Sequence, residues 1–509
     1  MSADSHAAVP NRGLITVSIM LATVMQVLDT TIANVALPSM QGNLGAAQDT
    51  ITWVLTSYIV SSAIMTPVTG WLAERFGRKA LFLTSVGGFT ISSMLCGIAG
   101  SLETMVLFRI LQGAFGAALV PLSQAVLLDI NPKERHGQAM ALWGAGIMVG
   151  PIIGPTLGGW LTESLSWRWV FYINLPVGIL AFLGILAFLP ETERRRRGFD
   201  VLGFAMLSLA VGALQMMLDR GEQLDWFSSP EIVIETFLAA TGLWVFVVHS
   251  VTARNPFIHP QIFRDRNLVT GLVFIFIVGI ILLASLALLP PLLQNLMGYP
   301  TITTGLVMAP RGVGTMISMI LVGRLVHRID PRLLILTGLG LTAVSLWEMT
   351  GFTIAMGSWP IMKTGIIQGL GLGLVFVPLS TMAFATLEPR FRTDAASLFS
   401  LVRNVGSSIG ISVVVTLLSQ NAAVNRVELV SRLTPFQPAV ADQMPAALAG
   451  DPTTLANLAA QVAQQATMIA YLDDFMLMMF VTLAATPLLL LLRRPARAPA
   501  AAGGPAIAE

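Results

Sequence analysis

The segment GWLAERFGRK at residues 70–79 has a counterpart in GRLVHRIDPR at residues 323–332, with Gly, Leu and Arg at the same spacing and an offset of 253 residues. Each segment directly follows an apolar stretch of membrane-spanning length. A repeat of this kind indicates two related halves within one chain.

A second repeat supports the first. Gln-Gly at 112–113 precedes the tripeptide PLS at 121–123, and Gln-Gly at 368–369 precedes PLS at 378–380 with one extra residue between them. The two repeats occur in the same order and at nearly the same offset. Chance similarity between short loop signals is the alternative interpretation, and the shared order argues against it.

The composition excludes an ordinary soluble protein. Of the 509 residues, 55% are hydrophobic and only 11% are charged, whereas soluble domains carry about 25% charged residues. The excess apolar surface must therefore face lipid. The net charge of +2 gives no reason to expect a nucleic-acid partner. Cys96 is the only cysteine, which excludes a disulfide framework and a cysteine-based metal site.

Apolar stretches long enough to cross a membrane recur along the chain. About 20 residues, rising 1.5 Å each, cross a hydrocarbon layer of ~30 Å. We predict an all-α integral membrane protein with fourteen spans. They begin near residues 14, 51, 80, 102, 138, 168, 199, 231, 268, 301, 332, 359, 395 and 474.

The repeats relate spans 2 and 4 to spans 10 and 12, which predicts two six-helix bundles with two inserted helices between them. The predicted segments are a cytoplasmic tail at 1–13, a first bundle at 14–190, the inserted helices at 191–260, a second bundle at 261–495 and a disordered cytoplasmic tail at 496–509. A long outer loop at about 420–473 is rich in Ala, Gln and Pro and could be helical in part.

The basic residues indicate an orientation. With both termini in the cytoplasm, the inner loops and tails hold 21 Lys and Arg, the outer loops hold five, and the spans hold three. Short loops rich in Lys and Arg stay in the cytoplasm. We therefore expect a multi-pass membrane protein whose termini are both cytoplasmic.

An acidic residue lies deep in the first span. Asp29, in the segment LDTTIANVALP at 28–38, is about 22 Å from the inner face, where an ionised carboxylate needs a partner or a wet cavity. Span 4 enters the membrane from the outer side, which places Arg109 at nearly the same depth as Asp29. We predict that the two pair, and that opening of the pair lets Asp29 bind and release a proton. A purely structural ion pair is the alternative.

Four further residues within the spans are candidates for a cavity or gate. Gln112 and Gly113 follow in span 4, and Arg311 and Arg403 lie in spans 10 and 13. The spans then hold three arginines against one deep aspartate, with Glu348 near the outer end of span 11 as a doubtful second acid. This balance favours neutral or anionic amphipathic substrates over strongly cationic ones. Alternatively, the two later arginines only bind backbone carbonyls.

Span 5 carries a motif of glycines and prolines. Small residues recur every four positions, and two Gly-Pro pairs lie four residues apart. Small residues let helices approach closely, and proline leaves a carbonyl without its donor and bends the helix. The motif residues are Gly146, Gly150, Pro151, Gly154, Pro155, Gly158 and Gly159.

The chain lacks the motifs of several enzyme classes. None of the three lysines follows a glycine, so a phosphate-binding Gly-x-x-x-x-Gly-Lys loop is absent. The sequence contains no His-Glu-x-x-His motif, and the five histidines fall in loops or at span ends. We expect no catalytic residue, no metal and no cofactor.

Several of these segments together resemble a known family. The loop at 70–79, the segment at 109–113 and the Gly-Pro motif resemble the major facilitator superfamily, and the last of them resembles its antiporter signature. The segment at 28–38, WRWVFYINLP at 167–176 and the fourteen spans resemble its drug:proton antiporter family. LQMMLDRGEQLDWFSS at 214–229 and the long outer loop resemble the EmrB-type permeases of tripartite multidrug pumps.

The resemblance implies proton-driven export of hydrophobic or amphipathic compounds across the bacterial inner membrane by alternating access. It also implies two partners, a periplasmic adaptor of the EmrA type and an outer-membrane channel. By the same resemblance, Asp29 falls at the coupling aspartate of the family and Arg109 at its span-4 arginine. The positions of the cytoplasmic gating loop correspond to Gly70, Glu74, Arg75, Gly77 and Arg78.

The second copy of the gating loop departs from the pattern, with His327 in place of the acid and Asp330 in place of the second glycine. This argues against a gating role for that copy. Two other functions stay open. The first is a stand-alone antiporter or symporter of the same superfamily. The second is a non-transporting membrane receptor or assembly subunit, against which Asp29, Arg109 and the span 5 motif argue.

Overall fold

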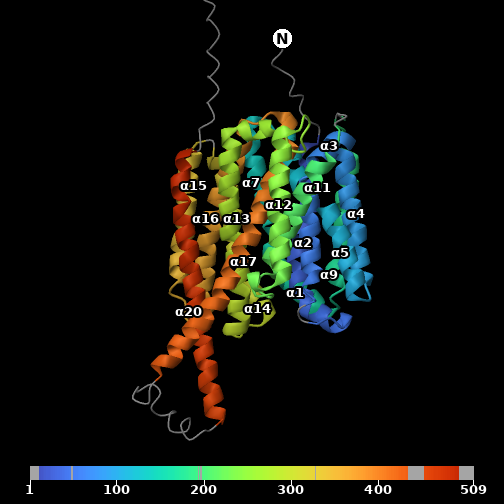
Figure 1. Ribbon diagram of the computed structural model, residues 1–509. Helices are drawn as coiled ribbons and strands as arrows, with labels where there is room; N and C mark the ends of the chain where they lie inside the picture. Colours follow the sequence, from blue (N-terminus) through green and yellow to red (C-terminus); the bar gives the residue numbers. More distant parts are fainter. Residues whose placement is uncertain are drawn as a thin grey trace, which may run out of the picture.

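The computed structural model describes residues 11–47, 50–192, 194, 198–326, 328–433 and 452–491. Every regular element in these ranges is a helix, and the helices stand side by side in one bundle (Figure 1). Thirteen helical segments in the described part are long and apolar enough to cross a membrane. A further span consists of two shorter helices, so the predicted all-α fold with fourteen spans is confirmed.

The first half of the chain contributes six spans, several of them broken into two helices. They are α1 (Arg12–Leu44), α2 (Trp53–Met65) with α3 (Thr69–Phe76), α4 (Arg78–Ile98), α5 (Leu102–Gly116) with α6 (Leu119–Ile130), α7 (His136–Ile147) with α8 (Val149–Ser164), and α9 (Trp169–Tyr172) with α10 (Asn174–Phe188).

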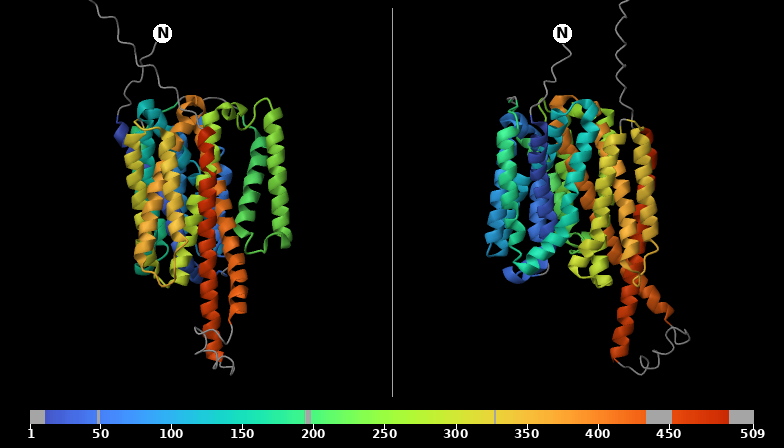
Figure 2. Two further views of the ribbon diagram at one scale, coloured as in Figure 1. Left: turned by 90° about the vertical axis from the view of Figure 1, so that its left-hand side faces the viewer. Right: turned by 180° about the vertical axis from the view of Figure 1, so that it is seen from behind.

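The second half follows after an inserted pair of helices. The inserted pair is α11 (Val201–Arg220) and α12 (Pro230–Thr252). The second half comprises α13 (Arg266–Pro291), α14 (Thr301–Leu325), α15 (Pro331–Met349), α16 (Ser358–Ala385), α17 (Arg392–Arg432) and α20 (Pro452–Ala484). We call the face at which α1 begins the proximal face, and the opposite face, beyond which α17 and α20 project, the distal face (Figures 1 and 2).

Prolines account for the breaks within the spans of the first half. A proline has no N–H to donate to the carbonyl four residues earlier. Thus α7 ends at Ile147, four residues before Pro151, and α5 ends at Gly116, next to the residue that Pro121 would have bonded. Pro67 lies in the gap between α2 and α3. The bend that the sequence predicts in span 5 is therefore present at its first Gly-Pro pair.

The two halves repeat one helix crossing. On Gly113 of α5, a Cβ atom would lie 2.4 Å from the Tyr58 carbonyl oxygen of α2. On Gly369 of α16, a Cβ atom would lie 2.1 Å from the Arg311 carbonyl oxygen of α14. Only a residue without a side chain permits either approach. The Gln-Gly repeat in the sequence therefore encodes the same contact in both halves.

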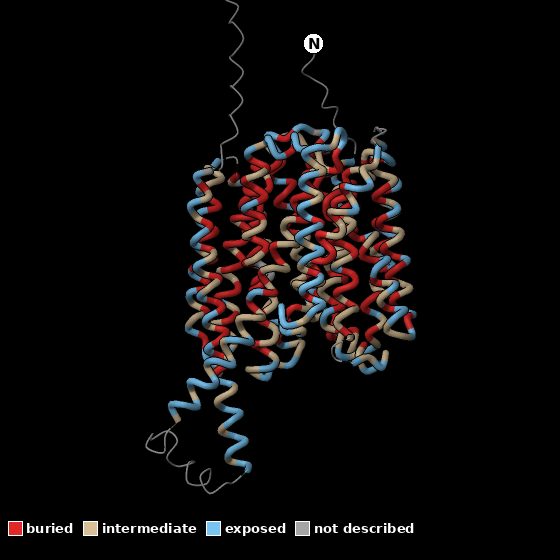
Figure 3. Tube along the Cα trace, viewed as in Figure 1, coloured by how far each residue is buried: buried red, intermediate tan, exposed pale blue. Residues whose placement is uncertain are grey.

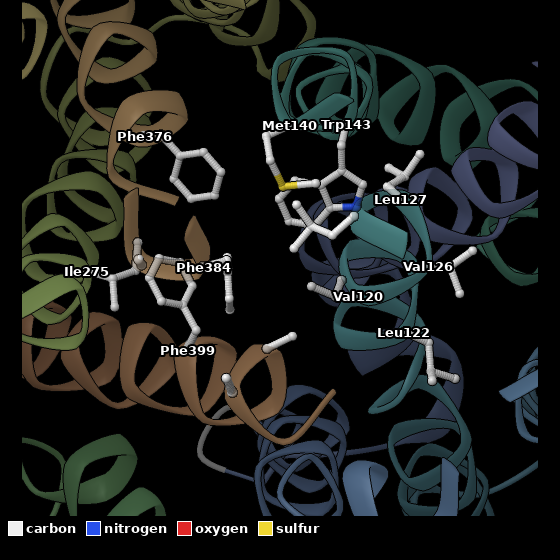
Figure 4. Packing of buried hydrophobic residues seen from close by; sticks show 14 of the residues in the cluster. Val120, Leu122, Val126, Leu127, Met140, Trp143, Ile275, Phe376, Phe384 and Phe399 are labelled. Carbon is white, nitrogen blue, oxygen red and sulfur yellow. The ribbon is translucent and has the colours of Figure 1, made fainter. Parts of the chain in front are cut away.

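The buried apolar residues show where the two halves meet. One cluster draws residues from both halves and includes many near the proximal face, while two others belong to single halves, one of them around Leu28 and the other around Phe475. Trp143 of α7 stacks on Phe376 of α16 within the shared cluster, with ring centroids 6.0 Å apart (Figure 4). The halves are thus joined by a common core on the proximal side.

Much of the segment predicted as a long outer loop is helical. α17 continues to Arg432 and α20 begins at Pro452, well before the predicted start of span 14 near residue 474. Ala, Gln and Leu are good helix formers, which explains the extension. These two helical arms project beyond the distal face and are largely exposed (Figure 3). Residues 434–451 lie outside the described residues, as do 1–10 and 496–509 of the predicted tails.

The inserted pair is anchored on the proximal side by a capped helix start. Asp200 accepts hydrogen bonds from the backbone N–H of Gly203 at 2.9 Å and of Phe257 at 2.8 Å, and it lies 2.8 Å from Nε2 of His249. Burial raises the pKa of Asp200, but these hydrogen bonds outweigh it and lower the pKa below its ordinary value. The carboxylate therefore ties α12 to the beginning of α11.

Toward the distal side, α11 lies between the two halves. The hydroxyl group of Thr56 on α2 donates to Asp219 of α11, and that of Ser408 on α17 donates to Gln215 at 2.9 Å. α12 packs on α11 and is the least buried of the thirteen long apolar helices in the described part of the chain. The inserted pair is thus attached through α11 at the edge where α2 faces α17.

Candidate functional site

Asp29 and Arg109 meet in the interior of the first half. Nη1 of Arg109 donates to Oδ2 of Asp29 at 2.7 Å. The other carboxylate oxygen, Oδ1, accepts from Nε2 of Gln112 at 2.9 Å and from Nδ2 of Asn174 at 2.7 Å. The carboxylate of α1 is therefore held by one guanidinium group and two amide groups that come from α5 and α10.

Arg109 has further partners around its guanidinium group. Nε donates to the Val54 carbonyl oxygen at 3.0 Å, and Nη1 also donates to Oε1 of Gln112 at 2.8 Å. The ring of Tyr58 lies 4.3 Å from the guanidinium carbon and the ring of Phe171 lies 5.7 Å from it, both within cation–π range. Nε and Nη1 of the buried cation therefore meet acceptors, and two aromatic rings lie against its guanidinium carbon.

The pair is sealed from solvent in this conformation. Asp29 and Arg109 are both 0% exposed, and Asn174 continues the network by donating to the Ser93 hydroxyl group at 2.9 Å. Removing one partner of a buried ion pair leaves an uncompensated charge and typically destabilises a protein by about 3–5 kcal/mol. A proton can reach Asp29 only after these helices separate enough to admit water.

The span 5 glycines pack against the part of α1 that carries Asp29. Three of them, one turn apart, face α1, and Cβ atoms added to them would collide with it. The distances are 2.8 Å from Gly150 to Cγ1 of Val27, 2.2 Å from Gly154 to Oγ1 of Thr31, and 3.0 Å from Gly158 to Cγ2 of Ile32. Gly146 faces Met20 in the same row, where an added Cβ would lie 2.2 Å from the terminal methyl carbon.

The other side of α8 contacts the second half. Gly312 and Gly305 of α14 face this side. A Cβ added to Gly312 would lie 2.1 Å from Ile152, and a Cβ added to Gly305 would lie 2.9 Å from Thr156. A Cβ on Gly159 would lie at an ordinary 3.6 Å from Ile302. α8 therefore lies between α14 and the helix that carries Asp29, so a shift of the second half can be passed to α1.

The second half has a different set of residues at the corresponding crossing. The offset that relates Gln112 to Gln368 places Ser285 at the position of Asp29 and Gly365 at the position of Arg109. Nη2 of Arg311, on the neighbouring helix, donates to the Ser285 hydroxyl group at 2.9 Å. The acid–base pair is thus built in the first half alone.

The cavity and gate candidates fall in several places. Gln112 is 0% exposed and bonds Asp29, and Gly113 packs on α2, so in this conformation both lie inside the first half instead of lining a cavity. Arg311 is buried within the second half. Arg403 is partly buried, and its Nη2 lies 3.5 Å from Oδ1 of Asn404. The structure does not bring these four residues together.

The sequence-based count of one deep aspartate is wrong. Asp474 of α20 is 1% exposed, although the sequence places it at the very start of span 14. Because α20 begins at Pro452, Asp474 lies well inside that helix. The charge balance that favours neutral or anionic substrates over strongly cationic ones therefore loses part of its basis.

The gating loop joins both halves at the proximal face. A Cβ on Gly70 would lie 1.6 Å from Oδ1 of Asp394, so α3 and α17 touch there. Gly77 has φ +90°, a conformation that side-chain-bearing residues rarely adopt, and it lets α4 begin directly after α3. Arg78 forms an ion pair with Asp129 of α6, and Arg392 of α17 pairs with the same carboxylate.

The other loop positions differ between the two copies. Glu74 is partly buried and Arg75 is exposed. In the second copy, Asp330 has φ −57° and its side chain caps α15 by accepting from the Arg332 N–H at 3.1 Å. The second copy therefore needs no glycine at this position. His327 lies outside the described residues.

Sequence reasoning missed several functional candidates. Asn174, which bonds Asp29, lies within the segment at 167–176, and an amide in an apolar span is a signal that was available. Asp129 and Arg392 could not be related, because they are 263 residues apart and each looks like an ordinary loop charge. Ser93 has no distinguishing signal, since serine is common in membrane helices.

The sequence profile of the Major Facilitator Superfamily matches residues 19–411. The chain belongs to this superfamily. Its members are transporters and not enzymes. The chain is 38% identical to the multidrug export protein EmrB of Escherichia coli (strain K12) over 461 residues, which cover 89% of each chain. It is also 38% identical to the fatty acid resistance protein FarB of Neisseria gonorrhoeae over 424 residues, covering 83% of this chain and 84% of that protein.

Solved structures of the superfamily share the fold. The human organic anion transporter MFSD10 superimposes with a TM-score of 0.61 at 16% identity, covering 93% of this chain and all of that one. The proton:xylose symporter XylE superimposes with a TM-score of 0.58 at 14% identity, covering 93% and 96%. At these identities the likeness establishes the major facilitator fold alone.

The contact between α8 and α1 can be tested with two alanine variants of one motif. Gly154→Ala places its Cβ against Thr31 and should lower the stability by about 1–3 kcal/mol, the usual effect of overpacking. Gly159→Ala meets Ile302 at an ordinary distance, so it should leave the stability unchanged or raise it by up to about 1 kcal/mol, because alanine is the better helix former. Thermal unfolding in detergent measures both. Equal effects of the two variants would contradict this packing.

The shared carboxylate at the proximal face provides a second test. Asp129→Asn should weaken proximal closure by about 1.5–3 kcal/mol, because two charged hydrogen bonds lose their anion. Spin labels at positions 76 and 329, in a Cys96→Ser background, should then report a larger population with separated halves. Glu388→Gln, which removes an exposed pair with Arg390, is the control and should leave the distances unchanged.

Proposed function

We propose that this chain is a proton-driven multidrug exporter that moves hydrophobic or amphipathic compounds across the inner membrane. The observation that carries the proposal is the fully buried Asp29, paired with Arg109 and placed on a helix that α8 connects to the second half. The likeness to EmrB over most of both chains supports the export of many compounds. No cofactor enters the proposal, since the proton gradient supplies the energy.

In the proposed cycle, Asp29 exchanges Arg109 for a proton. With the proximal face closed, the carboxylate stays ionised because Arg109, Gln112 and Asn174 donate to it. When water enters between the helices from the distal side, α1 shifts against α8 and these hydrogen bonds loosen. A proton from that side then neutralises Asp29 while Arg109 turns to Gln112 and the Val54 carbonyl oxygen, which it already contacts. When the halves rock and the proximal face opens, substrate enters there and Asp29 releases its proton.

The proposed orientation has the proximal face and both termini in the cytoplasm. The gating loop and most basic residues lie on that side, as the rule for cytoplasmic loops requires. The distal arms then project into the periplasm of a bacterium with two membranes. With the proximal face closed, the conformation described here is one in which Asp29 would next be reached from the periplasmic side.

Transport by the purified protein in liposomes tests the proposed coupling. With an imposed pH gradient, a fluorescent amphipathic compound and the internal pH are followed together. Asp29→Asn should reduce substrate-linked proton flux by about a hundredfold or more, the usual loss on removal of a positioned acid–base group. Full proton-driven transport by this variant would refute the coupling role.

Two controls separate coupling from folding. Glu163→Gln removes an exposed carboxylate from the distal end of α8 and should leave transport unchanged. The double variant Asp29→Asn/Arg109→Gln removes both buried charges, so it should fold better than Asp29→Asn alone and still lack coupling. Absence of flux of any substrate in the wild type would favour a non-transporting receptor or assembly subunit.

We also propose that the chain works with a periplasmic adaptor of the EmrA type and an outer-membrane channel. The helical arms of α17 and α20 support this proposal, because they extend past the other helices and carry exposed apolar side chains. Val424 is 63% exposed, Val427 71% and Leu455 47%. Apolar surface outside the membrane marks a site for a protein partner.

Binding of a purified EmrA-type adaptor tests this part of the proposal. Val424→Arg/Val427→Arg should abolish co-migration of the two proteins in size-exclusion chromatography, because charge would enter the apolar contact. Ser431→Arg adds one arginine at an already polar exposed position and should bind as the wild type does. A wild-type protein that exports fully and binds no adaptor would favour the stand-alone antiporter.

A further inference from the structure

Asp474 is a buried acid that the proposed cycle does not use. Its side chain is enclosed in the second half, and neither carboxylate oxygen has a hydrogen-bond partner among the described residues. The titratable groups that act on it are its neighbour Asp473, which is exposed, and Tyr471, one turn away on the same helix. Asp474 is therefore unlike Asp29, which has three donors.

The surroundings of Asp474 are apolar. Tyr471, Phe475 and Met478 of α20 belong to the buried cluster of the second half, together with residues of α13, α15 and α17. Phe475 meets the ring of Phe352 edge-on, with centroids 6.0 Å apart. No water-facing surface is left for this carboxyl group in the conformation described.

The charged residues of the helices packed on α20 are engaged elsewhere or lie at helix ends. Glu348 of α15 pairs with Lys363 of α16 at 2.8 Å. On α17, Arg392 and Asp394 lie in the first turn at the proximal end, Arg403 contacts Asn404, and Arg426, Glu428 and Arg432 lie in the exposed distal arm. Arg332 of α15 is likewise at the proximal end of its helix. On α13, Arg266 is the first residue of the helix, at its proximal end. None of these side chains supplies a hydrogen bond to Asp474.

The last span of the first half shows the contrast. Asn174 lies in the distal part of α10, and its amide group donates to both Asp29 and Ser93. Asp474 lies in the last span of the second half, 16 residues from the proximal end of that span at Leu490, and Asp29 lies 17 residues from the start of α1. The two acids therefore lie at similar depths. The acid without donors thus occupies the same layer as the acid with three.

An ionised carboxylate in an apolar site needs a partner, and without one the group is neutral. We propose that Asp474 is a second proton-binding site of this chain, occupied in this conformation and separate from Asp29. A proton taken from water forms an O–H bond with one carboxylate oxygen, and on release it returns to water. The two buried aspartates then differ in the same conformation: Asp29 is ionised and Asp474 carries a proton.

The site also adds to the proposed transport cycle, and this further step depends on the proposed function. When the second half moves, the packing of α20 on α13, α15 and α17 changes and water reaches Asp474, which then releases its proton. Each cycle would therefore move a proton at Asp474 in addition to the one at Asp29. Replacement of Asp474 should lower the number of protons per substrate while export continues.

Infrared difference spectroscopy on the purified full-length protein tests the site without relying on transport. A protonated carboxyl group absorbs through its C=O stretch, and an ionised one lacks this band. The band should be present in the wild type at neutral pH, absent for this group in Asp474→Asn, and retained in Asp473→Asn, which makes the same change at the exposed neighbour. An unchanged band in Asp474→Asn would overturn the proposal.

A second variant covers the case in which Asp474→Asn does not fold. Asp474→Glu keeps the acid and should shift the band in frequency, and a band that does not move would again overturn the proposal. In liposomes, the ratio of protons to substrate should fall in Asp474→Asn and stay unchanged in Asp473→Asn. If the wild type shows no proton-linked flux, the proposed function fails while the infrared result still decides the proton site.

Discussion

The buried pair of Asp29 and Arg109 is the constraint on which the rest of the first half depends. An aspartate placed so deep in an apolar span must be matched by donors, and five helices supply or enclose them: α1, α2, α4, α5 and α10. Because the donors come from different helices, any motion that changes the packing of the first half also changes the environment of Asp29. A charge that is costly to bury thus becomes a sensor of conformation.

Glycines determine where the remaining helices can approach this centre. The row in α8 lets it pack directly on α1, while α14 contributes glycines on the opposite side of α8. At the proximal face, Asp129 is shared between Arg78 of one half and Arg392 of the other. Toward the distal face, the first and second halves have separate apolar cores. Closure at one face is therefore held by charges and by a common core, and both must yield when the halves rock.

Sequence reasoning reached the helical fold, the span count and the depth match between Asp29 and Arg109, because each depends on local hydropathy and on the fixed rise of a helix. It could not reach the Asp129 to Arg392 contact, which depends on how distant helices pack. It failed at Asp474, because the sequence predicts an outer loop, helical at most in part, up to residue 473, whereas α20 already begins at Pro452. The Gln-Gly repeat predicts that the two halves correspond at this helix crossing. It does not predict that Ser285 stands in the second half where Asp29 stands in the first.

The continuous course of α17 from the proximal face to the tip of its arm has a mechanical consequence. At 41 residues the helix is about 60 Å long, roughly twice the hydrocarbon thickness. A stiff rod of this length acts as a lever, so a small tilt within the bilayer becomes a displacement of several ångströms at its far end. The arms would therefore report, outside the membrane, which way the halves have swung.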